Sequence, residues 1–125
     1  MKSRVLKNYL LYDGEEKNIL RDLMNPLGIS LREIPNTEKI IAATIVSGNY
    51  KVIALNDSMF STLEDKLFTL SYLIADYTIN ASDEYRYVFS ISNLDVDVYK
   101  FARKIYERRL LYSNISREEL KKVLK

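Results

Sequence analysis

Apolar side chains recur on a helical period through residues 61–80, STLEDKLFTLSYLIADYTIN. The apolar stripe steps by four, three, four and three residues and consists of Leu63, Leu67, Leu70, Ile74 and Tyr77. Ser61 and Glu64 have the spacing of a capping box, in which each side chain satisfies a backbone N–H of the first turn. The pattern therefore predicts a buried central helix over 61–80, capped by Ser61.

Shorter periodic segments lie on both sides of this helix. Strands are predicted where β-branched and aromatic residues cluster, over residues 29–34, 39–46, 50–55 and 85–91. The turn Ser47-Gly48-Asn49 makes the middle two strands a hairpin. Other helices are predicted over residues 15–27, 94–112 and 116–125. The segment VLKNYLLY, within residues 1–12, is compatible with a further short helix.

End signals support three of these helices. Gly28 follows the helix over 15–27, and Gly is the residue most often found just beyond a helix C-terminus. Asn93 or Asp95 can cap the helix over 94–112, and Ser116 with Glu119 forms a second capping box. The order of elements predicts an α+β fold with a small three- to four-stranded, mostly antiparallel sheet packed on the central helix. We expect one domain, residues 1–125.

Composition restricts the chemistry. The 125 residues are 47% apolar and include ten tyrosines, which is typical of a globular protein rather than a disordered one. The chain has no cysteine and no histidine, so it lacks disulfides, the commonest zinc ligands and the commonest general base. We see no signal peptide and no segment of about 20 apolar residues that could span a membrane, and we expect a cytoplasmic protein without membrane contact.

Charge is unevenly distributed along the chain. Residues 13–97 carry seven basic and fourteen acidic side chains, whereas residues 100–125 carry nine basic and three acidic ones. The candidate basic interaction face on the predicted helix consists of Lys100, Arg103, Lys104, Arg108 and Arg109. This face is either an ordinary solvated helix surface or a binding surface for an acidic partner or nucleic acid.

The stretch FTLSYLIADYTIN resembles the active-site helix of the ImmA/IrrE family of zinc metallopeptidases, whose usual form is FTLAHELGHYLLH. Phe68, Thr69, Leu70 and Tyr77 match it. Further segments resemble the family before and after this helix: ILRDLMNPLGISLREIP, KVIALNDSMFSTLEDKLFTL and LDVDVYKFARKIYE. The resemblance covers about residues 15–112 and leaves 113–125 as a C-terminal helical extension. It implies a zincin-like minimal metallopeptidase scaffold.

The catalytic residues of that family are replaced in this chain. The resemblance places Tyr72 and Asp76 where the family has its two zinc-binding histidines, Leu73 where it has the catalytic glutamate, and Asp97 where it has the third ligand. Leu73 cannot accept a proton, so we expect no catalytic residue, no zinc and no cofactor. Asp76 and Asp97 could instead hold a hard divalent ion weakly. The alternative is that Tyr72 fills the vacated metal cavity and contacts Asp76 one turn along the helix.

Three functions remain open at this point. The first is a catalytically inactive ImmA/IrrE-like protein that binds a protein partner; the resemblance implies regulation of a helix-turn-helix repressor of a phage or other mobile element. The second is a nucleic-acid-binding or anti-defence accessory protein that uses the basic C-terminal helices. The third is an enzyme with altered chemistry at Asp76 and Asp97. The sequence leaves the partner and the oligomeric state undetermined.

Overall fold

The computed structural model describes residues 21–108, 112 and 114–124. The short helix considered in residues 1–12, the first part of the helix expected over 15–27, Arg109 and Lys125 lie outside this range. The described chain opens with helical residues 21–24, followed by a 3₁₀ turn at Asn25–Leu27. Gly28 ends this turn in the left-handed conformation, with φ of 73°, which confirms its role as the helix stop.

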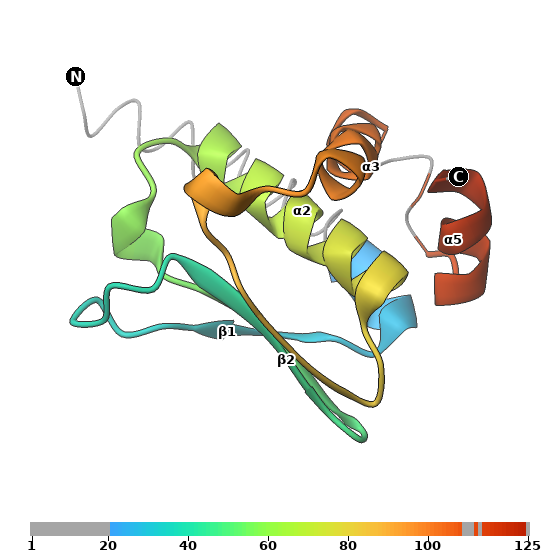
Figure 1. The fold of residues 1–125 in the computed structure, drawn as a ribbon, viewed down its shortest axis with the longest axis horizontal. Coiled ribbons are helices and arrows are strands. Elements are labelled where there is room, and N and C mark those ends of the chain that lie inside the picture. The colour runs from blue at the N-terminus through green and yellow to red at the C-terminus, as the bar shows by residue number, and fades with distance from the viewer. Residues whose placement is uncertain (1–20, 109–111, 113, 125) are drawn as a thin grey trace.

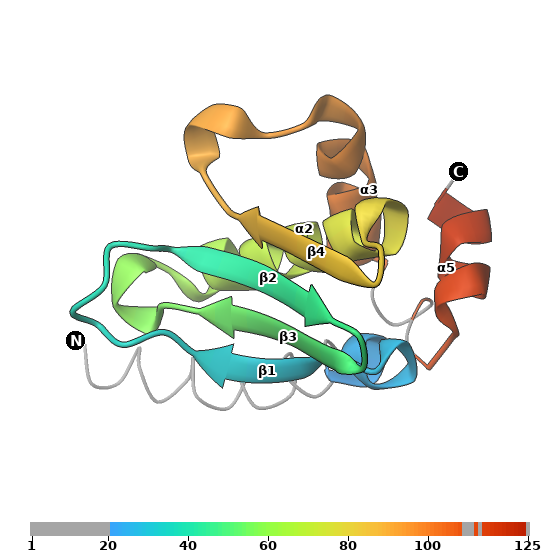
Figure 2. The ribbon, with the colours of Figure 1, turned by 60° about the horizontal axis from the view of Figure 1, so that its bottom comes forward.

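Four strands form one sheet in the order β1-β3-β2-β4. Their bounds are β1 (Ser30–Glu33), β2 (Ala42–Ser47), β3 (Tyr50–Leu55) and β4 (Glu84–Val88). The β2–β3 and β2–β4 pairs are antiparallel and β1–β3 is parallel, so the sheet is mixed and mostly antiparallel. This confirms the α+β class, the sheet and the hairpin. In Figure 2 the sheet faces the viewer, and β1 and β4 are its two edges.

The largest differences from the predicted strand limits are at the start of β2 and at the end of β4. The strand expected from Lys39 begins only at Ala42, because the side chain of Asn56 already binds the preceding backbone. Its Nδ2 donates to the carbonyls of Glu38 at 2.9 Å and Ile40 at 3.1 Å. The strand expected to reach Ile91 ends at Val88, and a 3₁₀ turn occupies Ile91–Asn93.

Helix α2 (Leu63–Asn80) is the middle layer of the molecule. Figure 1 shows α2 lying across one face of the sheet, with α3 (Val96–Glu107) on its other side. Because α2 is covered on both sides, the residues from Thr69 to Thr78 are all buried, including those outside the apolar stripe. The prediction of a buried central helix is confirmed, but its cap is not Ser61. Thr62 is the N-cap, and its hydroxyl accepts from the Asp65 N–H at 3.1 Å.

The C-terminal helices follow the predicted caps. Of the two candidates for α3, Asp95 is the N-cap, and its carboxylate accepts from the N–H groups of Asp97 and Val98. The helix ends at Glu107, earlier than the expected Tyr112. The capping box of the last helix, α5 (Arg117–Leu124), is confirmed, since Glu119 N–H donates to Ser116 Oγ at 3.2 Å.

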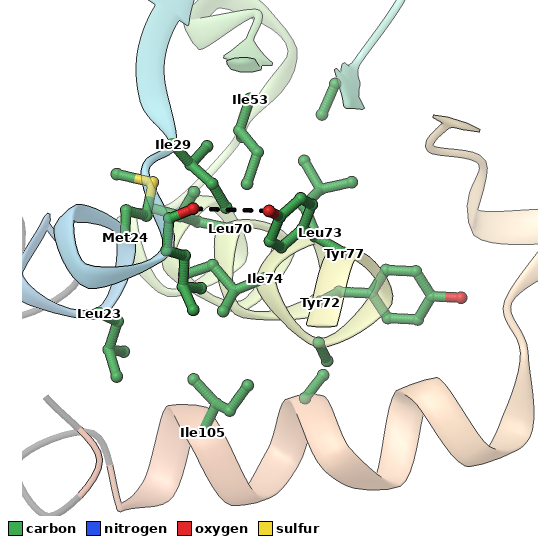
Figure 3. Packing of buried hydrophobic residues seen from close by; sticks show 14 of the residues in the cluster. Leu23, Met24, Ile29, Ile53, Leu70, Tyr72, Leu73, Ile74, Tyr77 and Ile105 are labelled. Carbon is green, nitrogen blue, oxygen red and sulfur yellow. Dashed lines mark hydrogen bonds between the residues drawn. The ribbon is translucent and has the colours of Figure 1, made fainter. Parts of the chain in front are cut away.

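The hydrophobic core lies between the sheet, α2 and α3. Figure 3 shows Leu70 and Leu73 directed toward Ile29 and Ile53 of the sheet side, with Ile105 of α3 on the opposite side of α2. Two buried hydroxyls of α2 are satisfied within the helix: Ser71 and Thr78 donate to the carbonyls four residues earlier, at 3.0 and 2.7 Å. None of the described helices is long and apolar enough to cross a membrane.

Candidate functional site

The side chain of Tyr72 occupies the interior at the site where the resemblance would place a zinc ligand. Tyr72 is only 1% exposed, and its ring packs edge-on against Phe89, with ring centres 5.4 Å apart. Its hydroxyl accepts from the backbone N–H of Asp95 at 2.9 Å and lies 3.5 Å from the hydroxyl of Tyr87, which donates to it. Tyr72 therefore links the middle of α2 to the start of α3 through a hydrogen bond. Figure 3 shows its ring extending away from Leu23 and Met24.

Asp76, one turn further along α2, is 3% exposed and is held by other groups. The hydroxyl of Tyr85 lies 2.8 Å from Oδ1 and 2.9 Å from Oδ2, and Asn80 Nδ2 donates to Oδ1 at 3.0 Å. The contact expected between Tyr72 and Asp76 is thus replaced by separate partners, Asp95 for the tyrosine and Tyr85 for the aspartate. We call Tyr72, Asp76, Tyr85 and Tyr87 the polar cluster.

Burial is the largest cause of the pKa shifts in the polar cluster. Desolvation raises the pKa of Asp76 above its ordinary value, although the hydrogen bonds from Asn80 and Tyr85 oppose the shift and the charge of Asp95 adds to it. Burial and the hydrogen bond to Asp76 raise the pKa of Tyr85, and burial and the bond to Tyr72 raise that of Tyr87. Both phenols therefore stay protonated and act as donors at neutral pH.

This raised pKa predicts a pH dependence. Between the unfolded value, about 4, and its higher folded value, Asp76 binds more protons in the folded state, so its contribution to stability falls as pH rises through that window. Replacing Asp76 with Asn removes the titration. We expect the stability of Asp76→Asn relative to the original chain to increase as pH rises from about 4 to 7. Urea denaturation across this range measures it, and a difference that stays constant or reverses would contradict it.

Leu73 and Asp97, the other two residues that the resemblance aligns with the family's active site, are not part of the polar cluster. Leu73 is fully buried in the hydrophobic core. Asp97 is exposed in the first turn of α3, and its N–H donates to the Asp95 carboxylate at 2.9 Å. The carboxylate whose charge adds to the raised pKa of Asp76 is that of Asp95.

The polar cluster does not fit a zinc ion. Both oxygens of Asp76 are within hydrogen-bonding distance of a phenol, and the Tyr72 oxygen accepts from a backbone N–H. Within the described residues, no three acidic side chains converge as ligands of a metal would. With neither His nor Cys in the chain, the donors that zinc prefers are also missing.

The predicted basic face is partly neutralised. Arg103 pairs with Glu107 at 2.8 Å on the exposed side of α3. Lys104 is half-buried, with its ammonium 5.7 Å from the ring centre of Phe101. Lys100 and Arg108 are exposed, whereas Arg109 lies outside the described residues.

Sequence reasoning missed Tyr85, Tyr87 and Asn80 as parts of this site. The two tyrosines alternate with exposed Glu84, Arg86 and Val88 in β4, so a period of two could have placed both rings on the inner face of the strand. Asn80 lies one helical turn after Asp76, a spacing that permits their hydrogen bond. Nothing in the local pattern indicates that β4 pairs with β2 beside α2.

Comparison of the chain with protein-family models, with curated proteins and with solved structures found no match.

Proposed function

We propose that this chain is a catalytically inactive ImmA/IrrE-like protein that acts as a protein-binding regulator, with the repressor of a phage or other mobile element as its candidate target. The observation that carries the proposal is the closed polar cluster. Tyr72, which the sequence resemblance aligns with a zinc ligand of the family, is 1% exposed, and its hydroxyl accepts from the Asp95 N–H. A buried and hydrogen-bonded tyrosine supports a structural role for a position that binds zinc in the peptidases.

The arrangement of elements is compatible with a zincin-like scaffold. The helix that would carry the catalytic motif, α2, lies between the sheet and the helix that would carry the third ligand, α3. The family assignment itself rests on the sequence resemblance over about residues 15–112. If the assignment holds, function must come from binding, because Leu73 replaces the general base and cannot move a proton.

We expect the purified protein to contain no stoichiometric zinc. The reason is the donor set: Tyr72 and Asp76 are engaged in hydrogen bonds, and the chain has no softer ligand. Elemental analysis after dialysis against zinc-containing buffer, followed by metal-free buffer, measures the content per chain. A value near one zinc ion per chain would overturn the inactive-site half of the proposal, and peptidase activity that is lost with a chelator would do the same.

A second candidate function is nucleic-acid binding, favoured by the exposed cations Lys100, Arg103 and Arg108 on α3 and its C-terminal end. Two observations weigh against it. Arg103 is paired with Glu107, and the segment over 13–97 carries twice as many acidic as basic side chains. A long polyanion passing near that acidic segment would be repelled.

We therefore expect no sub-micromolar binding of mixed-sequence DNA or RNA at about 150 mM salt, only the weaker contacts of non-specific association. Fluorescence anisotropy with labelled oligonucleotides measures this. The matched control replaces Lys100, Arg103 and Arg108 together with Glu. Tight, salt-sensitive binding that this variant loses would show that nucleic acid is the partner.

A further inference from the structure

An apolar hollow of about 310 Å³ opens beside the first turns of α2, and one of its walls is Phe89, which packs on Tyr72. Its walls come from the loop before α2, from α2 itself, from the segment after β4 and from Ile41, just before β2. The apolar lining includes Met59, Phe60, Phe68, Phe89, Ile91 and Leu94. This volume is at the lower end of the range for small-ligand pockets. It is large enough for one or two apolar side chains of a partner.

Apolar side chains also project at the mouth of the hollow instead of being covered. Ile91 is 72% exposed and Met59 is 44% exposed, and both line the hollow. Val96, 66% exposed, follows in the first turn of α3, and Val88, at the end of β4, is exposed as well. Isolated exposed apolar residues are ordinary, but exposed Ile91 and Met59 line a concave site together, which is characteristic of an interaction surface.

The charge of the surrounding segments determines the kind of partner. Residues 56–65 and 89–97 provide most of the walls, and together they contain five carboxylates and no lysine or arginine. Asp65 itself lines the hollow. Asp57 is paired with Lys66 at 3.1 Å, and Asp95 caps α3. The other three, Glu64, Asp65 and Asp97, neither cap α3 nor have an ion-pair partner among the described residues.

From the hollow, its exposed apolar rim and these carboxylates, we infer that this surface binds a peptide segment of a partner protein that places an apolar side chain in the hollow and flanks it with lysine or arginine. The inference rests on the proposed protein-binding function and specifies the chemistry of its partner. Apolar burial supplies the affinity, while the carboxylates select basic over acidic segments. The segment docks at the α2 and α3 N-terminal ends, so the basic side chains of α3 take no part.

The test uses an eight-residue peptide with a central Phe-Leu pair flanked by lysines, titrated into the ¹⁵N-labelled full chain and followed by two-dimensional NMR. One control peptide has glutamates in place of the lysines, and another has serines in place of Phe-Leu. We expect amide shifts concentrated at residues 57–69 and 89–97, with binding at least about fivefold weaker for either control peptide. Equal binding of the acidic peptide, shifts confined to residues 100–108, or no binding at millimolar peptide would each overturn the inference.

Two variants test whether the peptide binds at the hollow. Ile91→Lys blocks the rim at a side chain that is mostly solvent-exposed, and Val123→Lys, on the 45%-exposed Val123 of α5, adds the same charge elsewhere. Ile91→Lys should weaken peptide binding about fivefold or more and Val123→Lys should leave it unchanged. If a partner captured from extract binds Ile91→Lys as well as it binds the original chain, the hollow is not the docking surface, while protein binding stands. If no partner is captured at all, the proposed function fails.

Discussion

Changing Leu70 to Ala should lower the free energy of unfolding by about 2–5 kcal/mol, the range for truncating a buried leucine. Leu70 is 2% exposed in the middle of α2, and it faces the sheet rather than solvent. Its truncation leaves a cavity between α2 and the sheet. Because α2 also packs against α3, it cannot move into the cavity without disturbing that second contact. Urea denaturation followed by circular dichroism gives the difference directly.

The matched control for this prediction is Leu31→Ala on β1. Leu31 is 37% exposed, so the same chemical change there should cost well under half as much. Similar losses at the two positions would mean that α2 does not bury the face that carries Leu70. A loss below about 1 kcal/mol at Leu70 alone would have the same meaning.

Changing Tyr72 to Ala should destabilise the protein by about 3–5 kcal/mol, as expected for deleting a buried aromatic ring. The ring fills the space between α2, β4 and the start of α3, where it contacts Tyr87 and Phe89. Its hydroxyl also accepts the Asp95 N–H, so the variant loses a link to α3 together with the packing. Thermal and urea denaturation should both show this loss.

The variant Tyr72→Phe separates the two contributions. It keeps the ring and removes only the hydroxyl, so its cost should be about 1 kcal/mol, the usual net value of one hydrogen bond. If Tyr72→Phe is as damaging as Tyr72→Ala, the hydroxyl matters more than packing, and the view of Tyr72 as a cavity-filling residue is wrong. If neither change alters stability, a functional role for the phenol becomes the better explanation.

Local patterns predicted the elements well where one physical signal dominated. The apolar period marked α2, the β-branched run marked β3 with both of its limits, and side-chain caps located α3 and α5. The predicted cap of α2 was wrong by one residue because Ser61 and Thr62 are both good cap residues, and it is Thr62 whose hydroxyl accepts from the Asp65 N–H. The predicted start of β2 was wrong because the side-chain amide of Asn56 binds the carbonyls of Glu38 and Ile40. Asn56 lies in a distant part of the chain, so the local pattern does not indicate this contact.

The candidate site was less predictable for a related reason. The positions of Tyr72 and Asp76 on one helix face follow from their spacing, but their hydrogen-bond partners come from β4 and from the loop before α3. Those contacts require β4 to pair with β2 at the edge of the sheet beside α2. This pairing joins segments that are far apart in the sequence. The resemblance supplied Asp97 as the nearby carboxylate, whereas the turn at the start of α3 brings Asp95 close instead.

We propose that this chain works by binding a protein and not by cutting one. Affinity capture with the tagged full chain from native extract, followed by intact-mass spectrometry of what is captured, tests both halves together. The result that we expect is a partner recovered at its full length, in amounts that do not change when a chelator or zinc is added. A captured partner that is shortened during incubation with the purified protein, with the shortening abolished by the chelator, would contradict the claim.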